Sequence, residues 1–359
     1  MNNAEIKANN KKALIAMSGG VDSAVSALLA LADGYSCLGV TMDLSQRKSS
    51  DNLCCTSQDI LDAADVCKKL GIDHTVLTLG EEFRRYVISY FVEAYIKGET
   101  PNPCVVCNKH LKFGSLLAYA SKSECDTVVT GHYASVKKYS DRYLLCRAKD
   151  TGKDQSYVLW TLTQDQLAHT FFPLGVYTKE EVRRIAESHG FVNAHKHDSQ
   201  DICFIPDGDY VSFIERYCGR GFDKGDFTDT EGNVLGHHDG IVRYTPGQRK
   251  GLGIAFGRPM YVKSKDAAKN TVTLSSNEEL FSDRLTVKNI NLIALDRIDA
   301  PLHVEAKIRY NHKASPATVI QTSEDRLEIV FDTPQRAIAP GQSAVLYDGD
   351  VVIGGGIIE

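Results

Sequence analysis

The segment from Ala13 to Ala32 most constrains what this chain can fold into, because a glycine turn joins two apolar runs of different kinds. Ala13 to Met17 predicts a buried strand, and Ala24 to Ala32 predicts an apolar helix. The residues between them read SGGVDS. Glycines let successive backbone amides turn toward one point, and the helix directs its positive end and unpaired N–H groups there. The sequence therefore predicts a phosphate site at a strand-to-helix turn.

The alternative for this segment is an ordinary turn in which Asp22 or Ser23 caps the helix. It is less favoured, because two glycines, two hydroxyls and a carboxylate occur together in the right context. The turn lacks the Gly-Lys-Ser/Thr ending of a Walker A loop. It resembles the SGGxDS loop of the ATP pyrophosphatase superfamily, whose members split ATP into AMP and pyrophosphate while adenylating a carbonyl oxygen. This resemblance does not say which oxygen is activated.

The first two-fifths of the 359 residues alternate strand and helix patterns, which predicts a doubly wound parallel α/β sheet. Asp126 to Thr130 predicts a strand that ends at Gly131-His132. Ligands of such sheets bind beyond the carboxyl ends of strands, so we expect this end and the glycine turn to share one nucleotide crevice. After Asp207, short alternating segments predict two small, mostly β domains, the last a β-barrel. The Gly354 to Gly356 run predicts a turn between terminal strands.

We expect three domains, at residues 1–206, 207–282 and 283–359. The polar N-terminal residues lack the apolar stretch of a signal peptide, and no apolar run has the length that crosses a bilayer. The chain is therefore expected to be cytoplasmic, with no membrane partner. Ten cysteines without a secretory signal predict reduced thiols that are available for chemistry or metals.

Three cysteines stand in distinctive contexts. Cys104 and Cys107 lie in TPNPCVVCNKHLKF, and a helix expected from Asn108 to Ala120 would place Cys107 near a helix N-terminus that favours thiolate. Cys203 lies in DSQDICFI, where apolar neighbours would hold it in a turn. Spacing leaves several alternatives open: a zinc site completed by Cys54 or Cys55, a dithiol redox pair, buried structural residues, or catalysis. Five other cysteines are expected to be structural: Cys37, Cys67, Cys125, Cys146 and Cys218.

Several motifs in register favour catalysis. SGGVDS, TPNPCVVCNKHLKFG, TGHYA, KDQSY and DSQDICFI follow one another in this order. Together they resemble the bacterial tRNA-specific 2-thiouridylase family over most of the chain, and YTPGQRKGLGI, KIRY and APGQSAVLY are similar too. The resemblance implies ATP-dependent 2-thiolation of the wobble uridine of tRNA. Uridine O2 would attack the α-phosphate of ATP, pyrophosphate would leave, and sulfur would then replace the adenylated oxygen with release of AMP.

The resemblance also implies roles for particular residues. Cys203 takes the persulfide position, and Cys107 takes that of the assisting nucleophile, which releases sulfur by forming a disulfide with Cys203. Asp22 is implied as a catalytic residue that holds Mg²⁺ on the phosphates. The positions that match the ATP site are Ala16, Met17, Ser18, Gly19, Gly20, Val21, Asp22, Ser23, Met42 and Gly131. Those that match tRNA contacts are Asn102, Pro103, Cys104, His132, Lys153, Asp154, Gln155, Arg309, Tyr310 and Gln342.

The resemblance further implies macromolecular partners. These are tRNAs with a wobble uridine, for lysine, glutamate or glutamine, and a cysteine desulfurase or a sulfur-relay protein. Cys104 departs from the family pattern, because many relatives carry Asp there. Cys104, Cys107 and Cys203 thus form a three-cysteine set of the kind that holds a [4Fe-4S] cluster in related sulfurtransferases. A persulfide is slightly favoured over the cluster.

Two other functions remain open. Another adenylating enzyme on the same loop, such as an amidating or lysidine-forming synthetase, would not need Cys107 or Cys203. A non-catalytic tRNA-binding or metal-binding protein would tolerate Asp22→Ala and would not turn over ATP.

Overall fold

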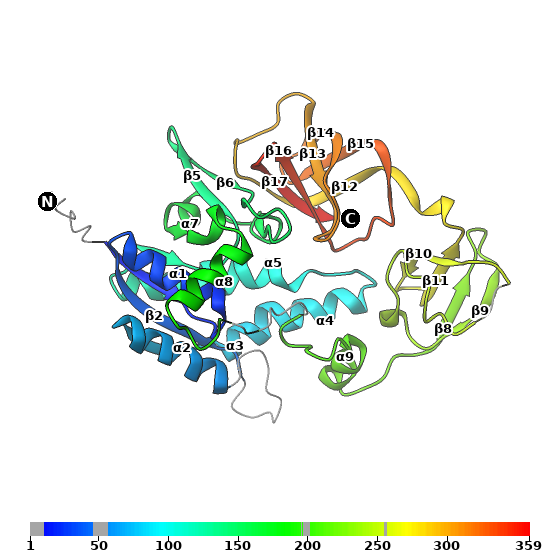
Figure 1. The fold of residues 1–359 in the computed structure, drawn as a ribbon. Coiled ribbons are helices and arrows are strands. Elements are labelled where there is room, and N and C mark those ends of the chain that lie inside the picture. Colours follow the sequence, from blue (N-terminus) through cyan, green and yellow to red (C-terminus); the bar gives the residue numbers. More distant parts are fainter. Residues whose placement is uncertain (1–10, 46–56, 195, 197–201, 255–256) are drawn as a thin grey trace, which may run out of the picture. The chain divides into compact units, whose positions relative to one another are not determined.

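The computed structural model describes residues 11–45, 57–194, 196, 202–254 and 257–359. The chain forms two compact units (Figure 1). The first unit comprises residues 1–86, 104–204 and 350–352, and the second comprises residues 87–103, 205–349 and 353–359. The thin grey stretches in Figure 1 are the residues outside the described ranges; they include Cys54, Cys55 and the first four residues of the DSQDICFI motif.

The first unit is built on a parallel sheet with strand order β3-β2-β1-β4-β7, which confirms the predicted α/β class. The strands are β1 (Lys12–Ala16), β2 (Ser36–Asp43), β3 (Asp73–Thr78), β4 (Thr127–Val129) and β7 (Thr170–Phe171). The chain runs from β1 outward to β2 and β3, and later occupies the other side of β1 with β4 and β7. The order therefore reverses between β1 and β4, and a ligand crevice is expected at that point.

Alternate residues of β1 face two separate cores, as the pleat of a strand requires. Ala13 and Ile15 pack with α1 (Val21–Ala32), α2 (Ser57–Leu70) and α8 (Lys179–Ser188). Leu14 packs in the other core with α6 (Leu116–Lys122).

Helix α8 has clear start and stop signals. Thr178 and Glu181 form a reciprocal capping box, and Gly190 follows the helix with φ +61°.

The other helices and strands before residue 200 complete this part of the chain. They are α3 (Gly80–Phe83), η1 (Arg84–Ile88), α4 (Ser89–Ile96), α5 (Pro103–Cys107), η2 (Asn108–Ser115), β5 (Ser135–Tyr139), β6 (Arg142–Cys146), η3 (Ser156–Val158), α7 (Gln164–Ala168) and η4 (Pro173–Val176). Two of them, η1 and η2, are π-helical. β5 and β6 pair antiparallel as a hairpin that turns at Ser140 to Asp141.

The second unit contains α9 (Tyr210–Cys218), a four-stranded sheet and a barrel. The sheet has order β10-β11-β8-β9 and is formed by β8 (Gly225–Thr228), β9 (Val234–His238), β10 (Tyr261–Asp266) and β11 (Thr271–Ser275). Short 3₁₀ turns stand at η5 (Ile241–Arg243) and η6 (Glu278–Leu280). The barrel runs β12-β15-β14-β13-β16-β17 and closes by pairing β12 with β17, as predicted for the C-terminal segment. Its strands are β12 (Phe281–Leu292), β13 (Leu302–Lys307), β14 (Ser315–Ser323), β15 (Arg326–Arg336), β16 (Ser343–Asp348) and β17 (Val351–Ile358).

The expected turn at Gly354 to Gly356 is wrong, because the three glycines lie inside β17. The neighbouring strand β12 passes too close for side chains. A Cβ on Gly354 would come within 2.8 Å of Leu292 Cα, and one on Gly356 within 2.6 Å of Val287 Cγ2. The glycines are therefore needed for close approach of two barrel strands rather than for a change of direction.

Across the described residues, none of the helices has both the length and the apolar character needed to span a membrane.

Candidate active site

The glycine turn lies where β1 passes into α1, at the point where the strand order reverses. Gly19 has φ +71°, a left-handed conformation that glycine accepts readily. The Ser23 hydroxyl ties the loop together: it accepts from Ser18 N at 3.2 Å and donates to the Gly20 carbonyl at 2.9 Å. Gly20 is the N-cap of α1, and no side chain caps the helix. The alternative of a cap by Asp22 or Ser23 is therefore wrong, and the N–H groups of the first turn face the loop without a side-chain acceptor at the cap.

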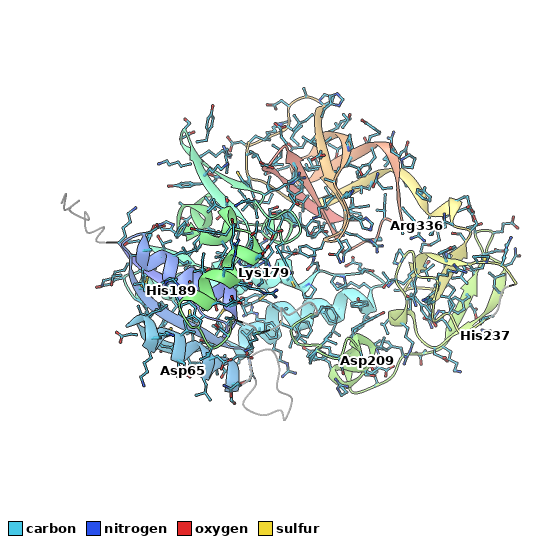
Figure 2. The ribbon with its side chains drawn as sticks, viewed as in Figure 1. Asp65, Lys179, His189, Asp209, His237 and Arg336 are labelled. Carbon is cyan, nitrogen blue, oxygen red and sulfur yellow. The ribbon has the colours of Figure 1, made fainter. Side chains whose placement is uncertain are left out.

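Asp22, in this first turn, is held by a buried cation. Lys179 Nζ donates to both carboxylate oxygens at 2.8 Å, and the Tyr133 hydroxyl donates to Oδ1 at 2.9 Å. Lys179, labelled in Figure 2, begins α8 and is 7% exposed. A lysine this buried is held in place by its partners, and here the partners are Asp22 and the face of the Tyr133 ring at 5.8 Å. The site thus combines a carboxylate, an ammonium and a helix N-terminus.

The carbonyl side of the glycine turn is held by a second pair of donors. Asn193 Nδ2 donates to the Gly19 carbonyl at 3.2 Å, and Lys196 Nζ donates to it at 3.3 Å. Lys196 also pairs with Asp59 at 2.6 Å and Asp62 at 2.9 Å on α2. Because these two donors hold the Gly19 carbonyl, the N–H groups of the turn are left to face the site.

Gly131 lies against the start of α1, as the shared crevice requires. A Cβ at Gly131 would come within 2.9 Å of the Asp22 carbonyl carbon and 3.0 Å of Ser23 N. Met42 is half-buried near the carboxyl end of β2, where it pairs with Leu77 of β3. The structure therefore brings the ends of β1 and β4 together, as one shared site requires, and a nucleotide there stays a prediction.

The residues present suit ATP with Mg²⁺. The helix N-terminus and Lys179 match the negative charge of phosphates, and the loop glycine leaves the backbone accessible. Mg²⁺ bound to ATP commonly takes only one or two protein carboxylates, with phosphate oxygens and water as the other ligands. Asp22 is such a carboxylate.

The structure corrects the expected environment of Cys107. Helical structure begins at Pro103 rather than Asn108, so Cys107 ends α5 instead of standing at a helix N-terminus. Proline is favoured at the first helical position, which explains the earlier start. Burial raises the pKa of the Cys107 thiol to about 11, and Lys112 acts against this effect. Cys104, in the first turn of α5, is accessible, although the surrounding atoms raise its pKa too.

Cys203 lies in a turn, as predicted, and is exposed. Its neighbour Phe204 is 2% exposed and packs edge-to-face on Phe83, with ring centroids 5.6 Å apart. Cys203 is disulfide-bonded, whereas Cys104 and Cys107 are both thiols, so its partner is neither of them. The Cys107–Cys203 disulfide of the expected reaction is thus not formed in this state.

His132 is buried between Thr130 and Lys112. Lys112 Nζ lies 3.3 Å from His132 Nε2, and Thr130 Oγ1 lies 2.6 Å from Nδ1. An ammonium can only donate, so Nε2 accepts and Nδ1 carries the proton that is donated to Thr130. Burial, with Lys112 next, holds the pKa of His132 well below its ordinary value, so the imidazole is neutral at pH 7.

Lys153–Asp154–Gln155 is the loop expected to contact tRNA. The side chains of Asp154 and Gln155 hydrogen-bond to other residues of the first unit. Asp154 accepts from Ala148 N and Ser156 N, and Gln155 Oε1 accepts from Tyr133 N at 2.9 Å. Asp154 is buried and Lys153 is half-buried. These bonds shape the loop, and an RNA contact by it stays a prediction.

The other residues expected to contact tRNA lie in the second unit. Arg309 donates to the carbonyls of Pro246 at 3.0 Å and Ala337 at 2.7 Å, and Gln342 donates to that of Thr100 at 2.8 Å. Tyr310 is 38% exposed and could stack on a base. Asn102 is half-buried and Pro103 is buried. Their contacts with RNA stay predictions.

No group of three or more His, Cys, Asp or Glu suited to a metal ion occurs among the residues that the structure describes. Cys104, Cys107 and Cys203 therefore do not form a cluster-binding set here, and the [4Fe-4S] hypothesis gains no support. A zinc site that uses Cys54 or Cys55 lies outside the described residues.

Sequence reasoning missed Lys179, Tyr133, Lys196 and Lys112. Lys179 occupies the first position of a well-capped helix and reads as an ordinary solvated residue. Tyr133 and Lys112 do fall within TGHYA and TPNPCVVCNKHLKF, and their place in these motifs was the available signal.

Comparisons with known proteins agree with this organisation. Residues 11–207 match a family model described as the tRNA methyl transferase HUP domain, residues 211–276 its PRC-barrel domain, and residues 282–358 an aminomethyltransferase β-barrel domain. Curated relatives are named tRNA-specific 2-thiouridylase MnmA. Those from Clostridioides difficile and Acetivibrio thermocellus are 48% and 46% identical over 98% of this chain, and they are covered over 98% and 100% of their own length. A solved 4-thiouridine synthetase–RNA complex with bound ATP is similar at a TM-score of 0.38 and 16% identity, over 57% of this chain and 50% of that one.

Proposed function

Because this chain belongs to the tRNA-specific 2-thiouridylase family and is an ATP-dependent tRNA uridine sulfurtransferase, we propose that it thiolates C2 of the wobble uridine in two steps, adenylation and sulfur transfer. The observation that carries this proposal is the pairing of Asp22 with Lys179 at the uncapped N-terminus of α1. This arrangement suits a phosphate chain, and it belongs to the same unit as Cys107 and Cys203.

In the first step, uridine O2 attacks the α-phosphate of ATP, the bond to the β-phosphate breaks, and pyrophosphate takes the electron pair. The N–H groups at the start of α1 would hold the phosphates, and the Lys179 ammonium would balance the charge that grows on pyrophosphate. Mg²⁺ held by Asp22 would further neutralise the phosphate oxygens. Gly131 leaves room for Asp22 to keep this position, because any side chain there would displace it.

In the second step, the outer sulfur of a Cys203 persulfide attacks C2, and AMP leaves with the former O2. The Cys107 thiolate then attacks the Cys203 sulfur, the bond to the transferred sulfur breaks, and C2 retains that sulfur. The product is a Cys107–Cys203 disulfide, which a thiol reductant must reduce before the next turnover. Cys203 is disulfide-bonded in this structure, so reduction must also precede its loading with sulfur.

The covalent chain supports a common site for the two steps. Lys196 is bound to the Gly19 carbonyl, and it precedes Cys203 by seven residues. Seven extended residues span at most about 25 Å. Cys203 therefore belongs to a segment that is anchored on the phosphate turn itself.

We infer a persulfide rather than a [4Fe-4S] cluster as the sulfur carrier. A cluster would need the thiolates of Cys104, Cys107 and Cys203 together, and the described residues offer no such group. Protein purified without oxygen should contain neither iron nor acid-labile sulfide and should still be active. Stoichiometric iron that is lost together with activity would overturn the inference.

The substrates and partners follow from the same proposal. We propose tRNAs for lysine, glutamate and glutamine as substrates, and a cysteine desulfurase or a sulfur-relay protein as the donor. The target base must leave the anticodon stack to reach the crevice. The exposed Tyr310 is one of the residues proposed to hold the RNA.

The test is mass spectrometry of nucleosides from unmodified tRNA incubated with the protein, ATP and a persulfide source. We expect 2-thiouridine, and equal amounts of AMP and pyrophosphate. Cys203→Ala should abolish the product, while Cys218→Ala, a change at a half-buried cysteine of α9, should not. A methylated uridine in place of a thiolated one would contradict the proposal and favour the activity named in the family model.

A further inference from the structure

Lys112 stands out because it lies five residues after Cys107 of the CxxC motif, on a π-helical segment. In an α-helix, residues five apart point about 140° away from each other, since each residue turns about 100°. A π-helix bonds residues five apart and brings them to one side. Cys107 is the last residue of α5, Lys112 is the fifth residue after it, and the segment between them, η2, is π-helical. The Ser115 hydroxyl donates to the His110 carbonyl five residues back at 3.3 Å, which fits this winding.

The position of Lys112 is fixed by the neutral imidazole of His132. Lys112 Nζ donates to Nε2 at 3.3 Å, and the Nδ1–Thr130 hydrogen bond holds the ring in the accepting tautomer. A neutral acceptor orients the ammonium without cancelling its charge. Thr130 and His132 thus act as a support that keeps a positive charge at this place.

That charge acts on both thiols. The titratable groups that influence Cys107 are Lys112, which favours its thiolate, and Cys104, which disfavours it. Lys112 favours the thiolate of Cys104 as well. The surrounding protein atoms raise the pKa of both thiols and are the larger effect, and the Lys112 ammonium offsets part of it.

We propose that Lys112 is a positioning residue for sulfur transfer, which keeps its ammonium near Cys107 so that the thiolate can form and attack the Cys203 sulfur once the outer sulfur has bonded to C2. This rests on the proposed function. The proton of Cys107 passes to solvent, its sulfur bonds to that of Cys203, and the electron pair of the broken S–S bond stays with the transferred sulfur. Lys112 contributes charge only and is unchanged by the step.

The experiment measures how fast iodoacetamide alkylates Cys107 as a function of pH, by mass spectrometry of the peptide that carries it. Lys112→Met removes the charge with similar bulk, Lys112→Gln is a second neutral variant, and Lys112→Arg restores the charge. Lys109→Met is the matched control, because Lys109 is an exposed lysine on the same π-helical segment.

We expect both neutral variants to shift the alkylation profile by one pH unit or more toward alkaline pH, which slows alkylation about tenfold near pH 8. Lys112→Arg should restore most of the rate, and Lys109→Met should follow the parent protein. The proposal would be overturned by a neutral variant that has the melting temperature of the parent protein and the same alkylation profile. If one neutral variant does not fold, the other decides.

A second measurement separates this proposal from the proposed function. With tRNA and ATP, Lys112→Met should release pyrophosphate at the parent rate but form 2-thiouridine at least about tenfold more slowly. Loss of both activities together would indicate a structural role and overturn the proposal. If the parent protein itself makes no 2-thiouridine, the proposed function fails, whereas the alkylation profile still reports on Lys112.

Discussion

Lys179 Nζ reaches both carboxylate oxygens of Asp22 at the same distance, 2.8 Å, although the two residues are 157 positions apart in the chain. The pair joins the first turn of α8 to the first turn of α1. The Lys179 ammonium thus balances the Asp22 carboxylate, and the N-terminus of α1 adds partial positive charge that suits a polyphosphate.

Lys179→Met is expected to slow pyrophosphate release from ATP about a hundredfold or more, because it removes the buried cation nearest the phosphate turn. The measurement is the rate of pyrophosphate release with saturating tRNA. Lys149→Met is the control, since Lys149 pairs with Glu181 of the same helix at 3.1 Å but is largely exposed. Equal rates for the two variants would show that Lys179 only supports the fold.

Gly131→Ala is expected to weaken ATP binding at least about tenfold, which corresponds to about 1.4 kcal/mol. The added methyl group would meet the backbone of Asp22 at 2.9 Å and push the start of α1 out of place. Calorimetric titration with a non-hydrolysable ATP analogue measures the loss. Gly152→Ala should bind normally, because its Cβ would only touch Asp150 Oδ1 at 3.4 Å. Unchanged affinity in Gly131→Ala would place the nucleotide elsewhere.

Sulfur transfer is expected to accelerate with pH. Burial raises the pKa of Cys107 to about 11, so at pH 7 to 9 the thiol is mostly protonated and its thiolate fraction grows about tenfold per pH unit. Single-turnover thiolation by persulfide-loaded protein should follow this rise, while Cys107→Ala should form no product. Cys218→Ala should retain the parent profile. A rate that does not change between pH 7 and 9 would exclude Cys107 deprotonation as the controlling event.

Gly354→Ala is expected to lower the free energy of unfolding by about 1–3 kcal/mol, because overpacking a close strand contact forces the backbone to shift. The new Cβ would lie 2.8 Å from Leu292 Cα in the adjacent barrel strand. Urea unfolding measures the change. Gly221→Ala, whose Cβ would meet nothing within 4 Å, should be close to neutral. If Gly354→Ala is equally neutral, the barrel strands can separate at little cost.

The strand and helix pattern of the first unit could be predicted from local sequence, because β1 and α1 are strongly apolar and α8 begins with a capping box. The proximity of two strand ends could also be predicted, since the SGG turn and Gly131 both follow strands whose ends meet in a parallel sheet. The relation between the ends of β1 and β4 is a consequence of topology, and the topology follows from the alternating pattern.

Other features depend on contacts that local sequence does not carry. The role of Gly354 and Gly356 is set by how closely β12 approaches, and the glycine run alone reads as a turn. The pairing of Lys179 with Asp22 needs the packing of α8 on α1. The environment of Cys107 was predicted wrongly because Pro103 starts the helix earlier and burial outweighs the helix dipole. The π-helical winding of η2 has no periodicity signal of its own.

The hydrogen bonds around Tyr133 connect the loop at Lys153–Gln155 with Asp22. Gln155 holds the Tyr133 backbone from both sides, at 2.9 and 2.8 Å, and the Tyr133 hydroxyl ends on Asp22. RNA that displaced the Lys153 loop would therefore move a hydroxyl on the carboxylate beside the phosphates. Such a linkage would couple ATP cleavage to RNA binding. Hydrolysis of ATP in the absence of tRNA would then stay low.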